Sequence, residues 1–130
     1  MNTRNPLAAA LVLAVAIPAL SAGPAQARSG DEVRRTGTCT GRAEVKIKAK
    51  HDDGRIELEA EVDSNRNGQV WRWSIRHNGD LAFVGRARTV APSGSFEVER
   101  RAVNAAGIDA FKFRARHRAS GQVCVVGVKL

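Results

Sequence analysis

The sequence predicts an all-β fold, a sandwich of seven antiparallel strands closed by one disulfide bond. Three observations support this prediction. Apolar and polar residues alternate with a period of two in several stretches, turn residues separate these stretches every 8–12 residues or so, and no part of residues 28–130 keeps a helical period for three turns. Seven such stretches follow one another from Ala43 to the end of the chain.

The first 27 residues are predicted to be a signal peptide. Arg4 precedes an apolar run over residues 7–20, and Ala25 and Ala27 occupy the two positions that a signal peptidase reads. The run is shorter than the roughly 20 residues of a spanning helix, so we expect no transmembrane segment after cleavage. The expected product is secreted, extracellular or associated with the cell wall. Its predicted parts are a loose segment over residues 28–36 and one β-sandwich domain over residues 37–130.

The chain contains two cysteines, Cys39 and Cys124. Export would place both in an oxidising compartment, where an even number of cysteines usually indicates disulfide bonds. The bond would close most of the domain into one loop, for which the chain-entropy model gives about 4–5 kcal/mol. The alternative is two separate buried thiols.

The first two strands are predicted to form a hairpin. Residues 43–50 and 56–62 alternate, and Asp53-Gly54 between them indicates a two-residue turn. This turn places three lysines opposite three glutamates, in the pairs Lys50–Glu57, Lys48–Glu59 and Lys46–Glu61. Each pair is worth a few tenths of a kcal/mol, and their coincidence supports the register.

The second hairpin includes WRWSIRHNGDLAF, residues 71–83. We expect a three-residue loop over residues 77–79, because a two-residue turn would not place the large apolar groups of both strands on one face. In this register Trp71 lies opposite Gly85, which leaves room for an indole. Trp71 and Trp73 are therefore predicted to be core, the alternative being an exposed binding surface.

Three more strands are predicted over residues 95–101, 109–118 and 122–130. The loop of residues 91–95 before the first of them could present an extended segment to a protein partner. The alternative is an ordinary strand connection, because proline and glycine are common turn residues for conformational reasons alone.

With this order of strands the chain resembles an immunoglobulin-like or fibronectin type III-like sandwich. Residues 107–111, Gly-Ile-Asp-Ala-Phe, resemble the approach to the sixth strand of such domains. Phe111 stands where these domains have a corner tyrosine, and the chain contains no tyrosine. The usual cysteine pair between the sheets is also missing. In this fold Cys39 and Cys124 would join the segment before the first strand to the last strand, its neighbour. The chain is also similar to small secreted proteins of unknown function from high-GC Gram-positive bacteria.

In such a sandwich the first, second and fifth strands form one sheet and the other four form the second. Outward residues of the first sheet mix both signs. Those of the second sheet include eight cations with no acid between them: Arg72, Arg76, Arg86, Arg88, Lys112, Arg114, Arg116 and Arg118. The chain has 21 lysines and arginines against 13 acids, a formal net charge of +8, and the signal peptide removes only Arg4 from this excess.

A face of one sign attracts polyanions. We therefore expect a non-catalytic binding module that engages an anionic component such as a teichoic acid or an anionic lipid surface. The alternatives are an acidic protein partner, bound by an interaction or inhibitor domain, and a basic surface that is merely solvated. Sequence-specific nucleic-acid binding is not expected, because the chain has no recognition motif and the tryptophans are assigned to the core.

No catalytic residue, metal ligand or cofactor is predicted. His51, His77 and His117 fall in or near turns, no serine neighbours a histidine in the sequence, and both cysteines are committed. The run from His51 to Asp53 is explained by the hairpin turn and offers fewer oxygen ligands than a hard cation needs. No metal-binding, phosphate-loop or nucleophile motif is present. A small hydrolase with a triad from separate loops is the weakest alternative.

Overall fold

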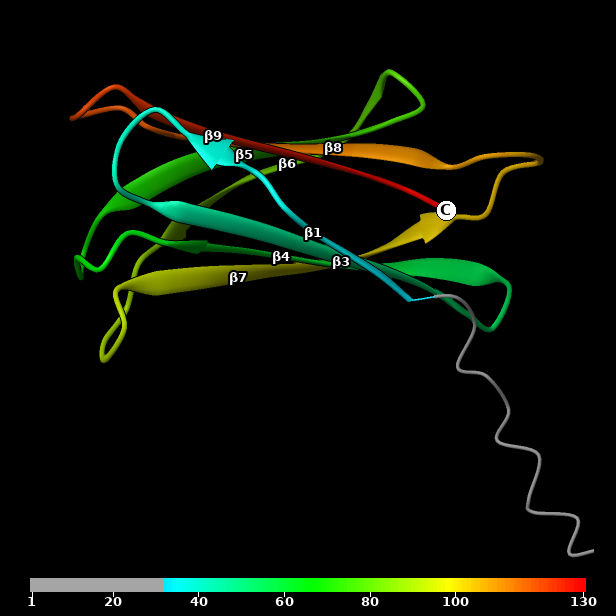
Figure 1. Ribbon diagram of the computed structural model, residues 1–130, viewed down its shortest axis with the longest axis horizontal. Helices are drawn as coiled ribbons and strands as arrows, with labels where there is room; N and C mark the ends of the chain where they lie inside the picture. Colours follow the sequence, from blue (N-terminus) through cyan, green and yellow to red (C-terminus); the bar gives the residue numbers. More distant parts are fainter. Residues whose placement is uncertain (1–31) are drawn as a thin grey trace, which may run out of the picture.

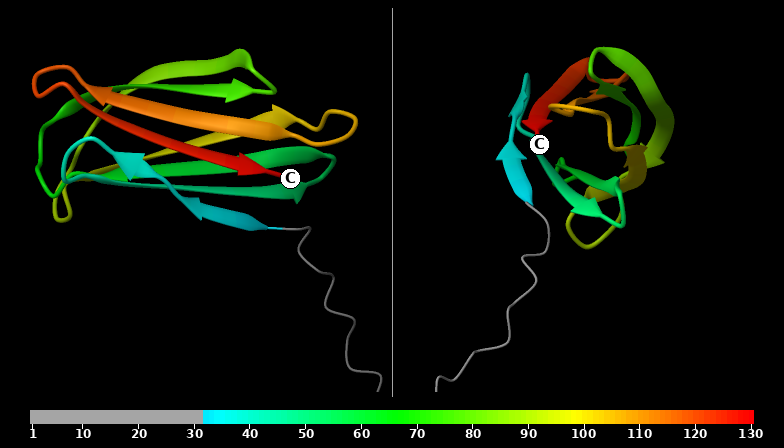
Figure 2. Two further views of the ribbon diagram at one scale, coloured as in Figure 1. Left: turned by 45° about the horizontal axis from the view of Figure 1, so that its top comes forward. Right: turned by 90° about the vertical axis from the view of Figure 1, so that its right-hand side faces the viewer.

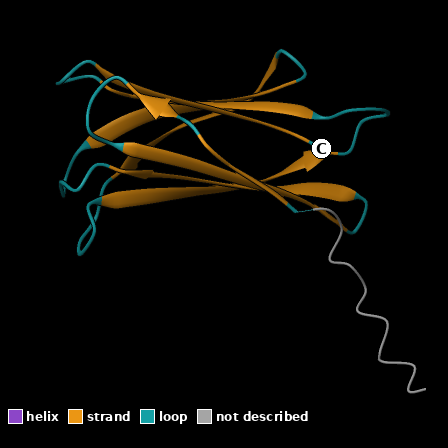
Figure 3. Ribbon diagram, in the orientation of Figure 1, coloured by secondary structure: helices purple, strands orange, loops and turns teal. Residues whose placement is uncertain are grey.

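The computed structural model describes residues 32–130, which form two antiparallel β-sheets packed face to face (Figure 1). Figure 3 shows that strands and connecting loops make up the whole of this part of the chain. The strand order is β1-β3-β4-β7 in the first sheet and β2-β9-β8-β5-β6 in the second. The strands are β1 (Val33–Thr36), β2 (Thr38–Cys39), β3 (Glu44–Asp52), β4 (Arg55–Asp63), β5 (Val70–His77), β6 (Asp80–Arg88), β7 (Ser95–Val103), β8 (Ala110–His117) and β9 (Gln122–Lys129).

The all-β prediction is confirmed, but residues 32–130 form nine strands rather than seven. The seven predicted strands are β3 to β9, and they divide between the two sheets as expected. The two additional strands, β1 and β2, precede them. Residues 33–36 were expected to be loose, and this is wrong because they pair with β3 along the edge of the first sheet. Three of the four β1 side chains are exposed, so the sequence carries no alternation that would indicate this strand.

The predicted signal peptide, residues 1–27, and residues 28–31 of the segment expected to be loose lie outside the described residues. Within residues 32–130, no helix is long and apolar enough to cross a membrane.

The β3–β4 hairpin has the predicted register. Asp53 and Gly54 form its two-residue turn, with φ angles of 47° and 72°, as a turn of this length requires. All three predicted lysine–glutamate pairs lie opposite each other. Their Nζ–Oε distances are 3.4 Å for Lys46–Glu61, 2.5 Å for Lys48–Glu59 and 3.7 Å for Lys50–Glu57.

The β5–β6 hairpin differs from the prediction in its turn and its register. Asn78 and Gly79 have φ angles of 49° and 89° and form a two-residue turn, not the expected three-residue loop. An irregularity between Ile75 and Arg76 then shifts the pairing by one residue. This β-bulge restores the parity that a two-residue turn alone would break. As a result Gly85 lies opposite Trp73, where it was expected opposite Trp71.

The core lies between the two sheets and is built from the inward residues of β3 to β9. Trp71 is fully buried and Trp73 is 5% exposed, so the prediction that both tryptophans are core is confirmed. Gly85 gives Trp73 its space, because a Cβ at this position would lie 2.5 Å from Cζ2 of the indole. The guanidinium of Arg100, an exposed residue of β7, lies 4.8 Å from the centroid of the Trp73 ring.

The other side of the sandwich is covered by β1 and β2, which lie beside β9 in the right-hand view of Figure 2. The chain passes from one sheet to the other at Gly37, whose N–H donates to the carbonyl of Val45 at 2.9 Å. A Cβ on Gly37 would overlap the carbonyl oxygen of Val125 in β9, so a glycine is required there. Cys39 and Cys124 lie opposite each other in β2 and β9, and the predicted disulfide bond between them is confirmed.

Candidate anion-binding face

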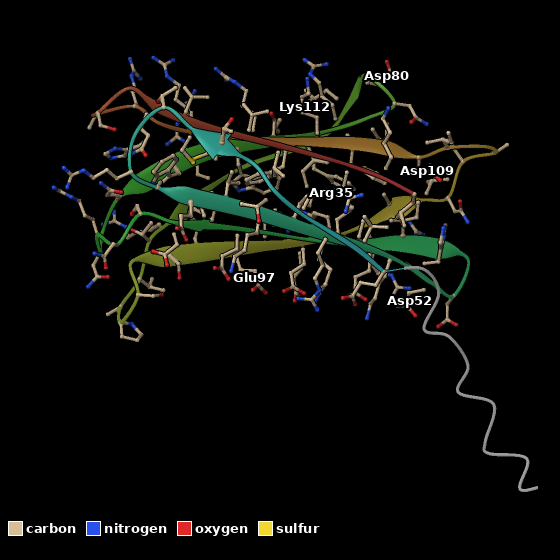
Figure 4. All side chains as sticks on the ribbon, in the orientation of Figure 1. Arg35, Asp52, Asp80, Glu97, Asp109 and Lys112 are labelled. Carbon is tan, nitrogen blue, oxygen red and sulfur yellow. A yellow bond between two sulfur atoms is a disulfide. The ribbon has the colours of Figure 1, made fainter. Side chains whose placement is uncertain are left out.

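The eight predicted cations all lie exposed on the outer surface of the second sheet or at its end. They come from β5, β6 and β8, with Arg118 directly after β8. Figure 4 shows nitrogen-tipped side chains, among them Lys112, along the outer side of this sheet, whereas Glu97 points outward from the other sheet. We call this set of eight residues, Arg72, Arg76, Arg86, Arg88, Lys112, Arg114, Arg116 and Arg118, the basic face.

Strand pairing places the cations in rows across the sheet. Arg72 lies between Arg86 on β6 and Arg116 on β8, directly opposite both. Arg76 lies opposite Lys112. Cα atoms of directly opposed residues are about 4.5–5.5 Å apart, so these positive groups are close neighbours unless their side chains diverge.

None of the eight cations makes an ion pair with a residue of the described part of the chain. One of them has an internal hydrogen bond: Arg76 Nη1 donates to the carbonyl of Gly79 at 3.0 Å. The lysines of β3 differ, because each is paired with a glutamate of β4. Within residues 32–130, no carboxylate therefore forms an ion pair that would offset the charge of the basic face.

The outer surface of the first sheet carries a small cluster of acids that the sequence pattern did not group. Glu59 on β4 and Glu97 and Glu99 on β7 bring one carboxylate oxygen each to within 4.8 Å of one another. Burial and then the charges of Glu59 and Glu99 raise the pKa of Glu97 above its ordinary value. Three monodentate carboxylates are fewer ligands than Ca²⁺ takes, so we assign no metal site here.

A buried polar pair was also missed by sequence reasoning. The side chain of Asp109 is 1% exposed, and its Oδ1 lies 2.5 Å from Nε2 of His77. The N–H of Ala105 donates to the same carboxylate at 3.1 Å, and the imidazole of His77 stacks on Phe111. These contacts fix the β7–β8 loop to the β5–β6 hairpin, which is a structural role.

A histidine and a serine meet at the opposite end of β8, although no such neighbours were expected from the sequence. His117 Nδ1 lies 2.7 Å from Oγ of Ser120, in the turn before β9. No acid is paired with His117 in the described part of the chain, and the buried Asp109 lies before the other end of the same strand. Asp109 and His117 are eight residues apart along an extended chain, which spans roughly 26 Å, so these groups do not form a triad.

No protein-family model, curated protein or solved structure matches this chain.

Proposed function

We propose that this protein is an exported, non-catalytic binding module that engages an anionic polymer, such as a teichoic acid, through its basic face. One observation carries the proposal: eight exposed cations share one sheet surface and none is paired with a carboxylate in residues 32–130. The electric fields of these charges add over one surface. At physiological salt each field decays over a Debye length of about 8 Å, so neighbouring cations on the surface still reinforce one another.

The arrangement has an energetic cost that a bound polyanion would remove. Like charges directly opposite each other across strands destabilise a sheet by roughly 0.2–1 kcal/mol per pair. Arg72 is opposed by an arginine on each side. The first sheet shows that this chain can alternate both signs on a surface, because its lysines and glutamates form ion pairs. A surface needed only for solubility would have no reason to concentrate one sign.

The fold and the disulfide bond are compatible with this role. Strands β3, β4 and β7 in one sheet and β5, β6, β8 and β9 in the other follow the order expected for a fibronectin type III-like sandwich, which supports an immunoglobulin-like identity. The disulfide bond is consistent with an extracellular location. We include secretion from a high-GC Gram-positive bacterium, outside the cell or at its wall, in the proposal.

The test is retention of the protein on a phosphate-bearing cation-exchange resin and on purified cell wall, eluted with increasing salt. The test variant changes Arg72, Arg114 and Arg116 to glutamate. The matched control also changes three exposed arginines to glutamate, but these lie outside the basic face: Arg42, Arg55 and Arg66. Both variants therefore have the same net charge.

The proposal expects wild type and control to elute at similar salt, and the basic-face variant to elute much earlier from both matrices. If both variants elute together, bulk charge alone explains retention and the basic face is not a binding surface. Steep weakening by salt is itself expected for contacts made mainly between charges.

A protein partner is the second candidate, and the edge strand β6 favours it. Leu81 and Val84 of β6 are 55% and 63% exposed, and this edge could pair with an extended segment of another chain. Such docking buries apolar surface and main-chain groups, so it should depend much less on salt than polymer binding does.

A further inference from the structure

One end of the second sheet contains a hollow of about 580 Å³ that sequence reasoning did not indicate. Its walls come from four strands, which contribute Arg35 of β1, Arg76 of β5, Lys112 of β8 and Lys129 of β9. Figure 4 shows Lys112 on the outer side of the upper sheet and Arg35 on β1, between that sheet and the lower one. The four cations thus reach the hollow from two sheets.

The hollow exists because small residues lie between the long ones. Gly127 lies opposite Lys112 and Ala110 lies opposite Lys129 in the β8–β9 pair, and both small residues line the floor. A Cβ on Gly127 would meet only the carbonyl oxygen of Phe111, at 3.6 Å. The backbone at this glycine does not need φ above zero, since Gly127 is not among the positive-φ glycines. A side chain could be placed here, and it would fill the hollow.

The four cations are not neutralised by protein groups. None of them is in an ion pair with a residue of the described chain, and no acid lines the hollow. Arg35 Nη1 donates to the carbonyl of Arg34, and Arg76 Nη1 donates to that of Gly79. Each guanidinium has five N–H donors, so both keep most of them for a ligand.

We propose that this hollow binds a phosphomonoester with a compact organic body. Two guanidinium groups and two ammonium groups suit a dianionic phosphate, which arginine binds through paired N–H donors and lysine through charge. A phosphodiester carries one charge and would use the site poorly. The volume lies within the range of small-molecule sites, and the methylene stems with Ala110 offer an apolar wall to the organic part.

The hollow shares Arg76 and Lys112 with the basic face, but phosphomonoester binding in the hollow does not depend on polymer binding by the basic face. Polymer binding requires the rows around Arg72, whereas the phosphomonoester requires Arg35, Lys129 and the open space above Gly127. A substitution that fills this space separates the two activities, because it changes no charge.

The test is titration of the full protein at pH 8, where a phosphomonoester is dianionic, followed by calorimetry and by amide chemical shifts. The probes are phenyl phosphate and its monoanionic counterpart methyl phenyl phosphate. A short oligothymidylate, with or without a 5′-phosphate, tests whether the protein binds a phosphomonoester at the end of a polymer. We expect phenyl phosphate or the 5′-phosphorylated oligomer to bind at least tenfold more tightly than the matched compound without a phosphomonoester. Whichever of these two binds more tightly shows whether the natural ligand is a small molecule or a polymer end.

Variants locate the site. Gly127→Val should weaken phenyl phosphate binding at least tenfold while leaving retention on purified cell wall unchanged, and Gly127→Ala should weaken phenyl phosphate binding less. Lys129→Gln should weaken phenyl phosphate binding severalfold without any steric change. Arg86→Gln deletes a cation at the other end of the basic face and should leave phenyl phosphate binding unchanged. Equal affinity for monoester and diester, or full binding by a folded Gly127→Val variant, would overturn the proposal. Shifts spread evenly over the basic face would also overturn it.

Discussion

Replacing Gly85 with alanine is expected to destabilise the protein, because the added methyl group would meet the ring of Trp73. A Cβ at this position would lie 2.5 Å from Cζ2 and 2.8 Å from Cε2 of the indole. Carbon atoms in contact are about 3.5–4.0 Å apart, so the ring or the strand has to move by about 1 Å. Trp73 is only 5% exposed and packs among buried side chains, which leaves it little space for this movement.

The size of the effect follows from two opposing contributions. Overpacking of a core costs about 1–3 kcal/mol. Alanine also restricts the unfolded chain, which offsets about 0.4–1 kcal/mol of this cost. We expect the free energy of unfolding of the Gly85→Ala variant to fall by about 1–2 kcal/mol. For a domain near 100 residues, each kcal/mol lowers Tm by about 4–8 °C.

Urea unfolding of wild type, Gly85→Ala and Gly127→Ala measures this effect. Gly127 belongs to the same sheet, but its added Cβ would make one ordinary contact at 3.6 Å, so this control should be at least as stable as wild type. A smaller ring in a Trp73→Phe background should reduce the cost of Gly85→Ala, which a double-mutant cycle would report as coupling. Equal stability of the two alanine variants, or no coupling to Trp73, would refute the steric explanation.

Three further predictions concern stability. Replacing Cys39 and Cys124 with serine should lower the free energy of unfolding by about 2–5 kcal/mol, because the bond spans 85 residues of sequence; a loss below 1 kcal/mol in urea unfolding would contradict this. Burial and neighbouring carboxylates raise the pKa of Glu97, so its ionisation opposes folding as pH rises through that pKa. Glu97→Gln should therefore raise Tm at pH 7 but not at pH 4, and an equal effect at both would count against it. Asp109→Ala leaves His77 and the N–H of Ala105 without their buried partner and should cost about 1–3 kcal/mol, measured by thermal unfolding against an Asp80→Ala control at the exposed first residue of β6.

The outward orientation of each cation could be predicted from the sequence because it depends on parity alone. In a strand, successive side chains point to opposite faces, so Arg72 must face away from the buried Trp71 and Trp73 whatever the register. The same property made the β3–β4 hairpin predictable, since the Asp53-Gly54 turn fixed the register through contacts between residues close in sequence.

The arrangement that joins distant residues was decided by the tertiary structure. With the bulge in the β5–β6 hairpin both tryptophans stay inside, but Gly85 pairs with Trp73 and not with Trp71 as predicted. The observed register thus differs from the predicted one by two residues, and a difference of two leaves an alternating pattern unchanged. Strand β1 has no apolar alternation and forms because an edge of the first sheet offers it backbone partners.

The sites follow the same division. Period-two alternation predicted that these cations face outward, because the face of each side chain is a local property. Their meeting on one surface depends on which strands share a sheet. Only the order of strands in space brought Arg35 to Lys129, Glu59 to Glu97 and His77 to Asp109. Contacts of this kind are set by which strands become neighbours, a result of packing one whole sheet against the other.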